Sequence, residues 1–489
     1  MEFCSLDEAW VFWKNYSRKM GFDVRKHYAN KSKKYNMITS RRFLCSKEGH
    51  RETDKRDDSV KDHRAEIRND CPVRLGVTLN RSNNGEVGCL LKYFQRKTLE
   101  DPSFFYAVQL DHSEQVTNIF WADARMRIDY DIFGDVITFD TTFSTNKEYR
   151  PFGVFIGFNH HRGLIVFGAA LLYDETAESF AWLFETFLEA HKSKKPKTIF
   201  TDQDAAMAKA LSEVFPETRH GLCTWHLMQN GIKHLGNLMK DGSCFLSDFK
   251  KAMFENEDDE KFEEAWEMLI SSYSLTENSW IKAIYKIKEK WAKCYMKTTI
   301  TLGMRSTQLS ESLNGDLKDY LKSSLDLNNF FKHFERVVSD KRYKELQSEY
   351  EIREKMPKLK VKTVPILIQA GNIYTRIIFE KFQVEWEKSL SNFIMEKNEA
   401  FDFREFLISS FNEGGEYKVI YHPFLQTTSC QCMMYETFGI LCSHILKVLD
   451  IIDIKLVSDK YILKRWTRKA RDEILEKSNR NVQVKLYFF

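Results

Sequence analysis

The feature that most constrains the fold is a succession of apolar segments between residues 136 and 214. Three consecutive strands are indicated by β-branched and aromatic runs at residues 136–140, 152–158 and 164–172. A helix, a short strand and a second helix follow at residues 178–191, 198–201 and 205–214. Because a turn at residues 160–163 joins the second and third strands, we expect an antiparallel meander followed by an αβα segment.

The first and fourth of these strands end in acidic residues, Asp140 and Asp202. The βββαβα order is that of the ribonuclease H-like fold, in which these two strands lie side by side, so we expect both carboxylates at one sheet edge. Adjacent carboxylates can hold Mg²⁺ ions that activate a phosphodiester. A third acid is needed from a helix, and Glu311, which begins a helical stretch, is the candidate. Asp204 is more simply explained as the N-cap of the next helix.

Helical segments follow this core. Cys223 and His226 form a Cys-X-X-His pair, which is at most half of a metal site, and core packing beside Trp225 is the simpler interpretation. Residues 245–296 are helical and rich in Trp and Lys. Residues 327–354 form a charged helix with an apolar stripe that is typical of a core or of a surface for a partner helix.

The strongest local motif is Cys-X-Cys-X9-Cys-X-His, formed by Cys430, Cys432, Cys442 and His444. Three thiolates and one imidazole are typical ligands of tetrahedral structural zinc sites. A strand-like segment precedes the motif and a short helix follows it, at residues 417–421 and 445–451. We expect Zn²⁺ to hold together a small ββα unit that lacks enough core to fold alone.

Positive charge is concentrated near the N-terminus. Residues 14–56 contain 14 Lys and Arg against 4 Asp and Glu, a net charge of +10, although the whole chain carries only +4. Aromatic residues are interleaved with this charge, which indicates a folded basic module. The charge is explained either by a solvated face or by a surface that binds phosphates. The candidate DNA contacts, which also resemble nuclear import signals, are Lys31, Lys33, Lys34, Arg41 and Arg42.

Within this module, residues 7–20 have helical spacing, and strand-like segments follow at residues 23–28 and 41–45. Cys45 and Cys71 are candidate zinc ligands, although two ligands do not complete a tetrahedron. Buried reduced cysteines are an equally good interpretation of this pair.

Composition excludes several classes of protein. The 489 residues include 43% apolar and 29% charged residues but only 20 Gly and 8 Pro, so we expect roughly three or four folded units and no large-scale disorder. Asp7 and Glu8 lie where a secretory signal would carry bases, and the apolar stretch at 163–172 is shorter than the ~20 residues that span a bilayer. We therefore expect an intracellular protein without a membrane segment, whose 10 cysteines serve metal binding.

Several segments together resemble the plant FAR-RED IMPAIRED RESPONSE family, nuclear transcription regulators descended from Mutator-like transposases. The resemblance covers nearly the whole chain. It is carried by the C-terminal cysteine motif, which is similar to a SWIM zinc finger, and by residues 40–49, 93–97, 118–124, 139–142, 201–207 and 223–226.

The resemblance implies that Asp140, Asp202 and Glu311 occupy the positions of the ancestral catalytic triad. It implies that the helices after His226 are the insertion typical of these transposases. It also implies a DNA-binding fold with a Cys-Cys-His-His zinc site at the N-terminus. This chain departs from that last pattern, because no His-X-His pair follows Cys71. We therefore expect the N-terminal module to bind DNA weakly and without sequence preference.

We therefore expect an α+β multidomain protein: a ribonuclease H-like transposase core with a helical insertion, an N-terminal basic DNA-binding module and a small C-terminal zinc finger. The expected divisions are 1–92 for the truncated basic module, 93–230 for the core, 231–356 for the insertion and remaining core helix, 357–416 for a connecting region, 417–455 for the zinc finger and 456–489 for a tail.

The expected function is that of a nuclear DNA-binding transcription regulator in light control of plant development, and not of an enzyme. An active transposase that cuts and joins DNA with three acids is the alternative. The expected cofactors are Zn²⁺ and, at the acids, Mg²⁺. The expected partners are DNA and other copies or members of the family, with no membrane and no small-molecule substrate.

Overall fold

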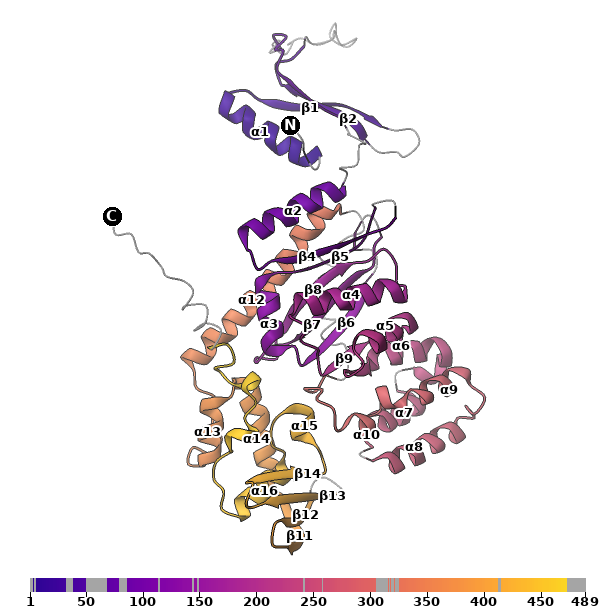
Figure 1. Ribbon diagram of the computed structural model, residues 1–489, viewed down its shortest axis with the longest axis vertical. Helices are drawn as coiled ribbons and strands as arrows, with labels where there is room; N and C mark the ends of the chain where they lie inside the picture. The colour runs from indigo at the N-terminus through magenta and orange to yellow at the C-terminus, as the bar shows by residue number, and fades with distance from the viewer. Residues whose placement is uncertain are drawn as a thin grey trace, which may run out of the picture. The chain divides into compact units, whose positions relative to one another are not determined.

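The structure is a computed structural model in which α-helices and β-sheets are combined in several domains (Figure 1). It describes residues 3, 6–31, 38–49, 68–78, 86–112, 115–142, 145–146, 149–240, 242–256, 258–304, 315, 317, 321, 325–411 and 415–472. The chain divides into two compact units, residues 1–99 and 100–489. None of the described helices has both the length and the apolar character that crossing a bilayer requires.

The first unit packs a helix on a small sheet. Helix α1 (Leu6–Met20) precedes an antiparallel sheet of order β1-β2-β3, and α2 (Glu86–Glu100) follows it. The strands are β1 (Val24–Lys31), β2 (Ile38–Cys45) and β3 (Arg74–Thr78). Ala9 and Trp13 of α1 are buried with Phe43 of β2. The predicted helix and first two strands are confirmed.

The second unit is built on a seven-stranded sheet of order β10-β9-β6-β7-β8-β5-β4. Its strands are β4 (Phe105–Leu110), β5 (Val116–Ala122), β6 (Val136–Thr142), β7 (Phe152–Phe158), β8 (Leu164–Leu171), β9 (Thr198–Thr201) and β10 (Arg219–Leu222). Strands β6, β7 and β8 are the antiparallel meander that the sequence predicts, and β9 runs parallel to β6.

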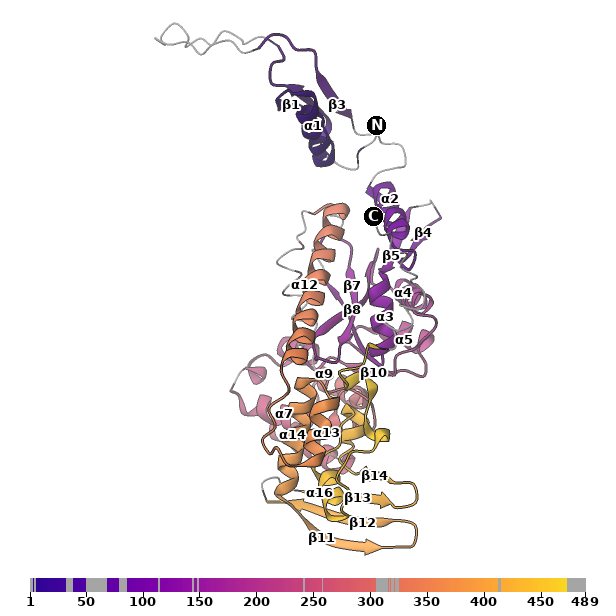
Figure 2. The same ribbon diagram turned by 90° about the vertical axis from the view of Figure 1, so that its left-hand side faces the viewer.

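Helices cover both faces of this sheet (Figure 2). Helices α3 (Ala124–Phe133) and α4 (Ala177–Ala190) pack on one face, with α5 (Ala205–Val214) beside α4, and α12 (Leu327–Glu354) packs on the other. Adjacent residues of β5 point to opposite faces. The ring centroids of Phe120 and of Phe187 on α4 are 6.2 Å apart, whereas those of Trp121 and of Phe331 on α12 are 4.6 Å apart. The apolar stripe of α12 is therefore core.

The C-terminal half of α12 carries a polar stripe instead. Arg342, Glu345 and Glu349 are spaced three and four residues apart, so they share one face of the helix. Arg342 contacts Asp123 at the start of α3, and Glu345 binds Arg125 and Arg471. This stripe fixes the helix to the core by ion pairs where the aromatic contacts end.

The helical insertion has its own core. It contains α6 (Thr224–Leu235), α7 (Cys244–Phe254), α8 (Asp259–Ser272), α9 (Ser279–Lys286), α10 (Lys293–Met296) and two 3₁₀ turns at Gly236–Met239 and Lys288–Lys290. Trp266 and Trp291 are buried against Phe249 and Phe262 at its centre. The Trp-rich helical section predicted from the sequence is therefore a packed domain.

The region from 357 to 416, expected as a connection, contains regular structure. Helices α13 (Pro365–Ile373) and α14 (Arg376–Leu390) lead into a four-stranded antiparallel sheet of order β11-β12-β13-β14. Its strands are β11 (Asn392–Glu399), β12 (Arg404–Ser410), β13 (Glu416–His422) and β14 (Thr427–Cys430). Since β12 pairs with β13, the cysteine motif belongs to a larger unit than the ββα unit expected.

The residues after 455, expected as a tail, are packed as far as residue 472. Helices α15 (Met434–Phe438) and α16 (Ser443–Ile451) are followed by 3₁₀ turns at Asp459–Tyr461 and Lys464–Trp466. Trp466 is fully buried and stacks on Phe438, and its indole N–H donates to the Phe438 carbonyl. The sequence did not reveal this because isolated Trp and Arg residues in a short segment have no periodicity.

Candidate functional site

The strand pairing brings two predicted acids to one sheet edge. Thr138 of β6 pairs with Phe200 of the parallel strand β9. Two positions further along each strand are Asp140 and Asp202, so the two acids stand at the same level on neighbouring strands. Glu311, the third predicted acid, lies outside the described residues.

Two other acids gather at this edge. Glu175, just before α4, accepts a 2.6 Å hydrogen bond from the Thr141 hydroxyl. Burial raises the pKa of Glu175, and Asp204, Asp202 and Asp140 raise it further. Burial also raises the pKa of Asp202, partly offset by the backbone N–H of Asp204, 3.2 Å away. The edge is therefore a cluster of carboxylates, which a cation would stabilise.

Asp204 has the structural role expected of it. Its carboxylate accepts a 2.7 Å hydrogen bond from the Met207 N–H and caps α5. Glu175 was missed, because an acid in a loop carries no strand-end or helical signal.

The Cys-X-X-His pair faces the acids. Cys223 caps α6, and its sulfur accepts a hydrogen bond from the His226 N–H at 3.3 Å. Burial lowers the pKa of His226, but Cys223, Asp140 and Asp202 outweigh it and raise that pKa. Cys223 is buried, as a packing role requires, whereas Trp225 is 39% exposed. His226 adds a polarised imidazole to the acidic edge.

The four residues of the C-terminal motif converge. Cys430 ends β14, Cys442 caps α16, and His444 lies in the first turn of α16, where its ring stacks on Tyr417. The potential ligand atoms of Cys430, Cys432, Cys442 and His444 all lie within 4.8 Å of one another. Thiol hydrogen bonds from Cys430 and Cys442 lower the pKa of Cys432.

This donor set fits a metal ion such as zinc. A tetrahedral Zn²⁺ with bonds of about 2.3 Å to sulfur separates its ligand atoms by about 3.8 Å. Cys430 Sγ and His444 Nδ1 are 3.6 Å apart, and Cys430 and Cys442 are buried. Three thiols crowded in a buried site are the arrangement that a divalent cation relieves by displacing their protons.

The cysteines of the first unit also meet. Cys45 is buried, its N–H donates to the Val73 carbonyl at 2.9 Å, and Cys71 donates its N–H to the Lys47 carbonyl. Burial raises the pKa of the Cys45 thiol, and its neighbour Cys71 raises it further. The pair could supply two ligands of a metal site, and His50, His63 and the Cys89 side chain, which are possible completions, lie outside the described part of the molecule.

The predicted DNA contacts are only partly described. Arg41 and Arg42 lie on β2, and the Arg42 guanidinium is 5.1 Å from the centre of the Tyr28 ring. Lys31 ends β1, and its side chain, together with Lys33 and Lys34, lies outside the described residues. Lys26 Nζ lies 5.1 Å from the centre of the Trp10 ring, so basic side chains on this sheet make cation–π contacts with aromatic residues.

Comparison with protein families finds a match for the N-terminal basic module and another for the sheet-based core. A FAR1 DNA-binding domain model matches residues 11–92, and a MULE transposase domain model matches residues 136–230. These two matches define a protein that joins a DNA-binding module to a transposase-derived core.

The chain is similar to curated plant proteins over almost its full length. Protein FAR1-RELATED SEQUENCE 5 of Arabidopsis thaliana is 30% identical, over 97% of this chain and 71% of that protein. Protein FAR1-RELATED SEQUENCE 7 of Arabidopsis thaliana is 32% identical over 96% of this chain and 67% of that protein. Protein FAR-RED IMPAIRED RESPONSE 1, from the same plant, is 33% identical over 80% of this chain and 47% of that protein. The chain belongs to the FAR1-related family.

Proposed function

We propose that this protein is a nuclear DNA-binding transcription regulator derived from a MULE transposase, and that it does not act as an enzyme. The observation that carries this proposal is the match of a FAR1 DNA-binding domain to residues 11–92, the region that includes the +10 segment. Clustered Lys and Arg favour DNA because binding releases the counterions of the phosphates.

The core supports a transposase origin. Strands β8, β7, β6, β9 and β10 have the order and directions of a ribonuclease H-like sheet, extended at one edge by β5 and β4. In this proposal the core is a scaffold for DNA and protein contacts. Zn²⁺ held by Cys430, Cys432, Cys442 and His444 stabilises the sheet of β11 to β14 and α16 as a SWIM-type accessory surface.

The binding experiment compares the full chain with a chain that lacks residues 1–92. Both are used to select bound sequences from random DNA at physiological salt, and loss of binding on deletion is expected. If both proteins bind equally, the core and not the basic module is the DNA-binding part.

Transcription and location need separate measurements. We propose that the protein enters the nucleus and acts in light responses, as the name of FAR-RED IMPAIRED RESPONSE 1 suggests for that relative. A fluorescent fusion tests the location. Transcript profiles of plants with and without the gene, grown in darkness and in far-red light, test the stimulus. If the gene changes the transcript profile equally in darkness and in far-red light, light control is contradicted. Retention of the fusion protein in the cytoplasm would contradict a role as a nuclear transcription regulator.

An active transposase is the second candidate, and the observation that favours it is the acidic edge. Asp140 lies in β6 and Asp202 directly follows the neighbouring strand β9, with Glu175 and His226 near them. Mg²⁺ bound there, completed by Glu311, would polarise a phosphodiester. A plasmid excision assay with Mg²⁺ or Mn²⁺ tests it, with Asp202→Asn as the inactive control. Excision by the parent alone would favour the enzyme.

A further inference from the structure

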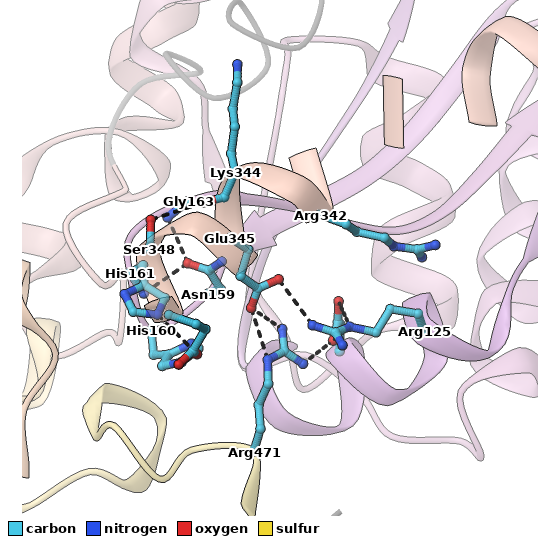
Figure 3. A network of polar contacts seen from close by, with 12 residues as sticks. Arg125, Asn159, His160, His161, Gly163, Arg342, Lys344, Glu345, Ser348 and Arg471 are labelled. Atoms are coloured by element: carbon cyan, nitrogen blue, oxygen red, sulfur yellow. Dashed lines mark hydrogen bonds and ion pairs between the residues drawn. The ribbon is translucent and has the colours of Figure 1, made fainter. Parts of the chain in front are cut away.

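A second group of metal-ligand side chains lies where α12 meets the turn between β7 and β8. His160 and His161 occupy this turn, and Glu349 projects from α12 (Figure 3 shows the surrounding polar contacts). His160 Nε2 is 2.5 Å and His161 Nε2 is 3.1 Å from the same oxygen, Glu349 Oε1. The three ligand atoms lie within 4.8 Å of one another, so they converge on one point.

The turn holds both imidazoles in place. The Asn159 side-chain oxygen accepts hydrogen bonds from the N–H groups of His161 and Gly163, at 2.9 and 2.8 Å. The Thr375 hydroxyl donates to the His160 carbonyl at 2.6 Å. The His160 ring also stacks on Phe133, with an interplanar angle of 11°. Both histidines therefore reach Glu349 from a backbone that is already fixed, which lowers the cost of binding a ligand.

The group is buried and its polar atoms are incompletely paired. His160 is fully buried, and His161 is 7% exposed. His161 Nε2 lies 3.1 Å from the Glu349 carboxylate oxygen but makes no well-directed hydrogen bond to it. A buried imidazole nitrogen without a hydrogen bond is unfavourable unless it binds something else. A ligand between the rings and Glu349 would satisfy this nitrogen.

The neighbouring cations are already neutralised. Arg471 donates to Glu345 at 2.5 and 3.0 Å and also pairs with Asp129. Arg125 pairs with the same two acids. This ion network, the other half of Figure 3, leaves Glu349 as the acid that faces the histidines.

We propose that His160, His161 and Glu349 bind one divalent transition-metal ion, Zn²⁺ by preference, which fastens α12 to the turn between β7 and β8. Two imidazoles and one carboxylate are a frequent zinc ligand set and leave one position for water. Bonds of about 2.0 Å place such ligand atoms about 3.3 Å apart, so Glu349 Oε1 must move away from His160 Nε2, now 2.5 Å distant, to admit the ion.

The test uses Co²⁺ on the full chain after removal of its metals with a chelator. Co²⁺ bound by thiolates gives a charge-transfer band, whereas Co²⁺ bound by imidazole and carboxylate gives only weak visible bands. The protein carrying Asp202→Asn, which removes the acidic edge as a competing site, is expected to bind one ion without the thiolate band, besides ions that produce it. If every tightly bound Co²⁺ ion is accompanied by the thiolate band, the proposal is wrong and Glu349 is an ion-pair partner of the histidines.

Variants locate the ion. Glu349→Gln and His161→Ala are expected to lower the affinity for the ion without a thiolate band at least about tenfold, while the thiolate band keeps its intensity. Glu351→Gln is the matched control, because Glu351 is exposed on the same helix. Unchanged affinity in Glu349→Gln would overturn the assignment. If a variant loses the thiolate band as well, it has misfolded, and the titration of the Asp202→Asn protein decides.

Hydrogen exchange gives a second measurement on the parent. The ion is expected to slow exchange of amides in residues 343–354 and 158–164 several-fold, because it joins the two segments. Equal exchange with and without metal in both segments would contradict the fastening role.

Discussion

Thr138 and Phe200 are paired across the parallel strands β6 and β9, and this pairing sets Asp140 and Asp202 at one level of the sheet. Neighbouring strands lie about 4.8 Å apart, so we expect the two carboxylates to be near enough to share a cation. The first prediction is that they bind Mn²⁺ together. A crystal structure with Mn²⁺ should show both carboxylates at the ion, about 5 Å or less from each other.

The matched variants for that site are Asp202→Asn and Asp204→Asn. The first should abolish Mn²⁺ binding at the edge. The second should preserve it, because Asn caps a helix as well as Asp does. Carboxylates of Asp140 and Asp202 more than about 10 Å apart would rule out an inherited catalytic site.

The second prediction concerns the C-terminal motif. Cys432→Ser should remove one Zn²⁺ and loosen β13, β14 and α16, because site and fold are coupled. Zinc content and hydrogen exchange of the full chain measure both effects. Cys244→Ser, at an exposed cysteine, should change neither. Equal zinc in Cys432→Ser and the parent would contradict the site.

The third prediction concerns DNA binding by the first unit. A fragment of residues 1–99 should bind DNA without sequence preference, with affinity falling steeply as salt rises. In the full chain, Arg41→Ala with Arg42→Ala should reduce the slope of log affinity against log salt by about 2 if both contact phosphates. Stoichiometric zinc and a selected DNA sequence for the fragment would show that other residues complete the site of Cys45 and Cys71.

The fourth prediction concerns Arg471. The side chains of Asp129 and Glu345 are only 3% and 5% exposed, and Arg471 pairs with both. Arg471→Met leaves two buried acids with Arg125 alone, so it should lower the free energy of unfolding by about 3–5 kcal/mol. Urea denaturation measures this. The triple variant Asp129→Asn, Glu345→Gln, Arg471→Met should lose less than the sum of its single changes, because no buried carboxylate remains unpaired and the Arg125 side chain, 41% exposed, is solvated.

The fifth prediction concerns pH. Burial, with Arg127 and Lys194 nearby, lowers the pKa of His191 to about 3 in the folded protein, against about 6.5 when unfolded. The unfolded chain therefore takes up this proton first as the pH falls. The stabilisation contributed by neutral His191 is complete above pH 6.5 and is lost between pH 6.5 and 3. At pH 5 this loss lowers the free energy of unfolding by roughly 2 kcal/mol.

Replacement of this histidine tests the pH dependence. His191→Gln should make the urea midpoint less sensitive to pH between 6.5 and 5. His112→Gln, at an exposed position, should leave the pH dependence as it is in the parent. If both variants follow the parent curve, acid instability arises elsewhere.

Local patterns predicted much of this fold. The helix at 327–354 has the bounds of α12, and the strands at 152–158 and 198–201 have those of β7 and β9, because their apolar periodicity is strong. The edge position of Asp140 and Asp202 followed from strand order. Spacing alone also identified the four residues of the Cys and His cluster.

Contacts between distant segments could not be predicted in this way. His160 and Glu349 are 189 positions apart, and no periodicity states which glutamate of a charged helix faces a particular turn. Glu175 is one acid among 70, and only the folded sheet brings it to the edge. The connecting region was misjudged because β11 is largely exposed and lacks an apolar pattern.

The packing of residues 465–471 has a consequence for the order in which the protein is made. Arg465 hydrogen bonds to the carbonyls of Phe133 and Phe158, and Arg471 binds acids on α3 and α12. The strands of the seven-stranded sheet are synthesised more than 200 residues before these arginines, so the core of the nascent chain cannot complete its packing until the arginines have been synthesised. A nonsense codon at position 464 would therefore damage a domain whose strands it leaves entirely encoded, and such an allele should behave as a loss of the protein.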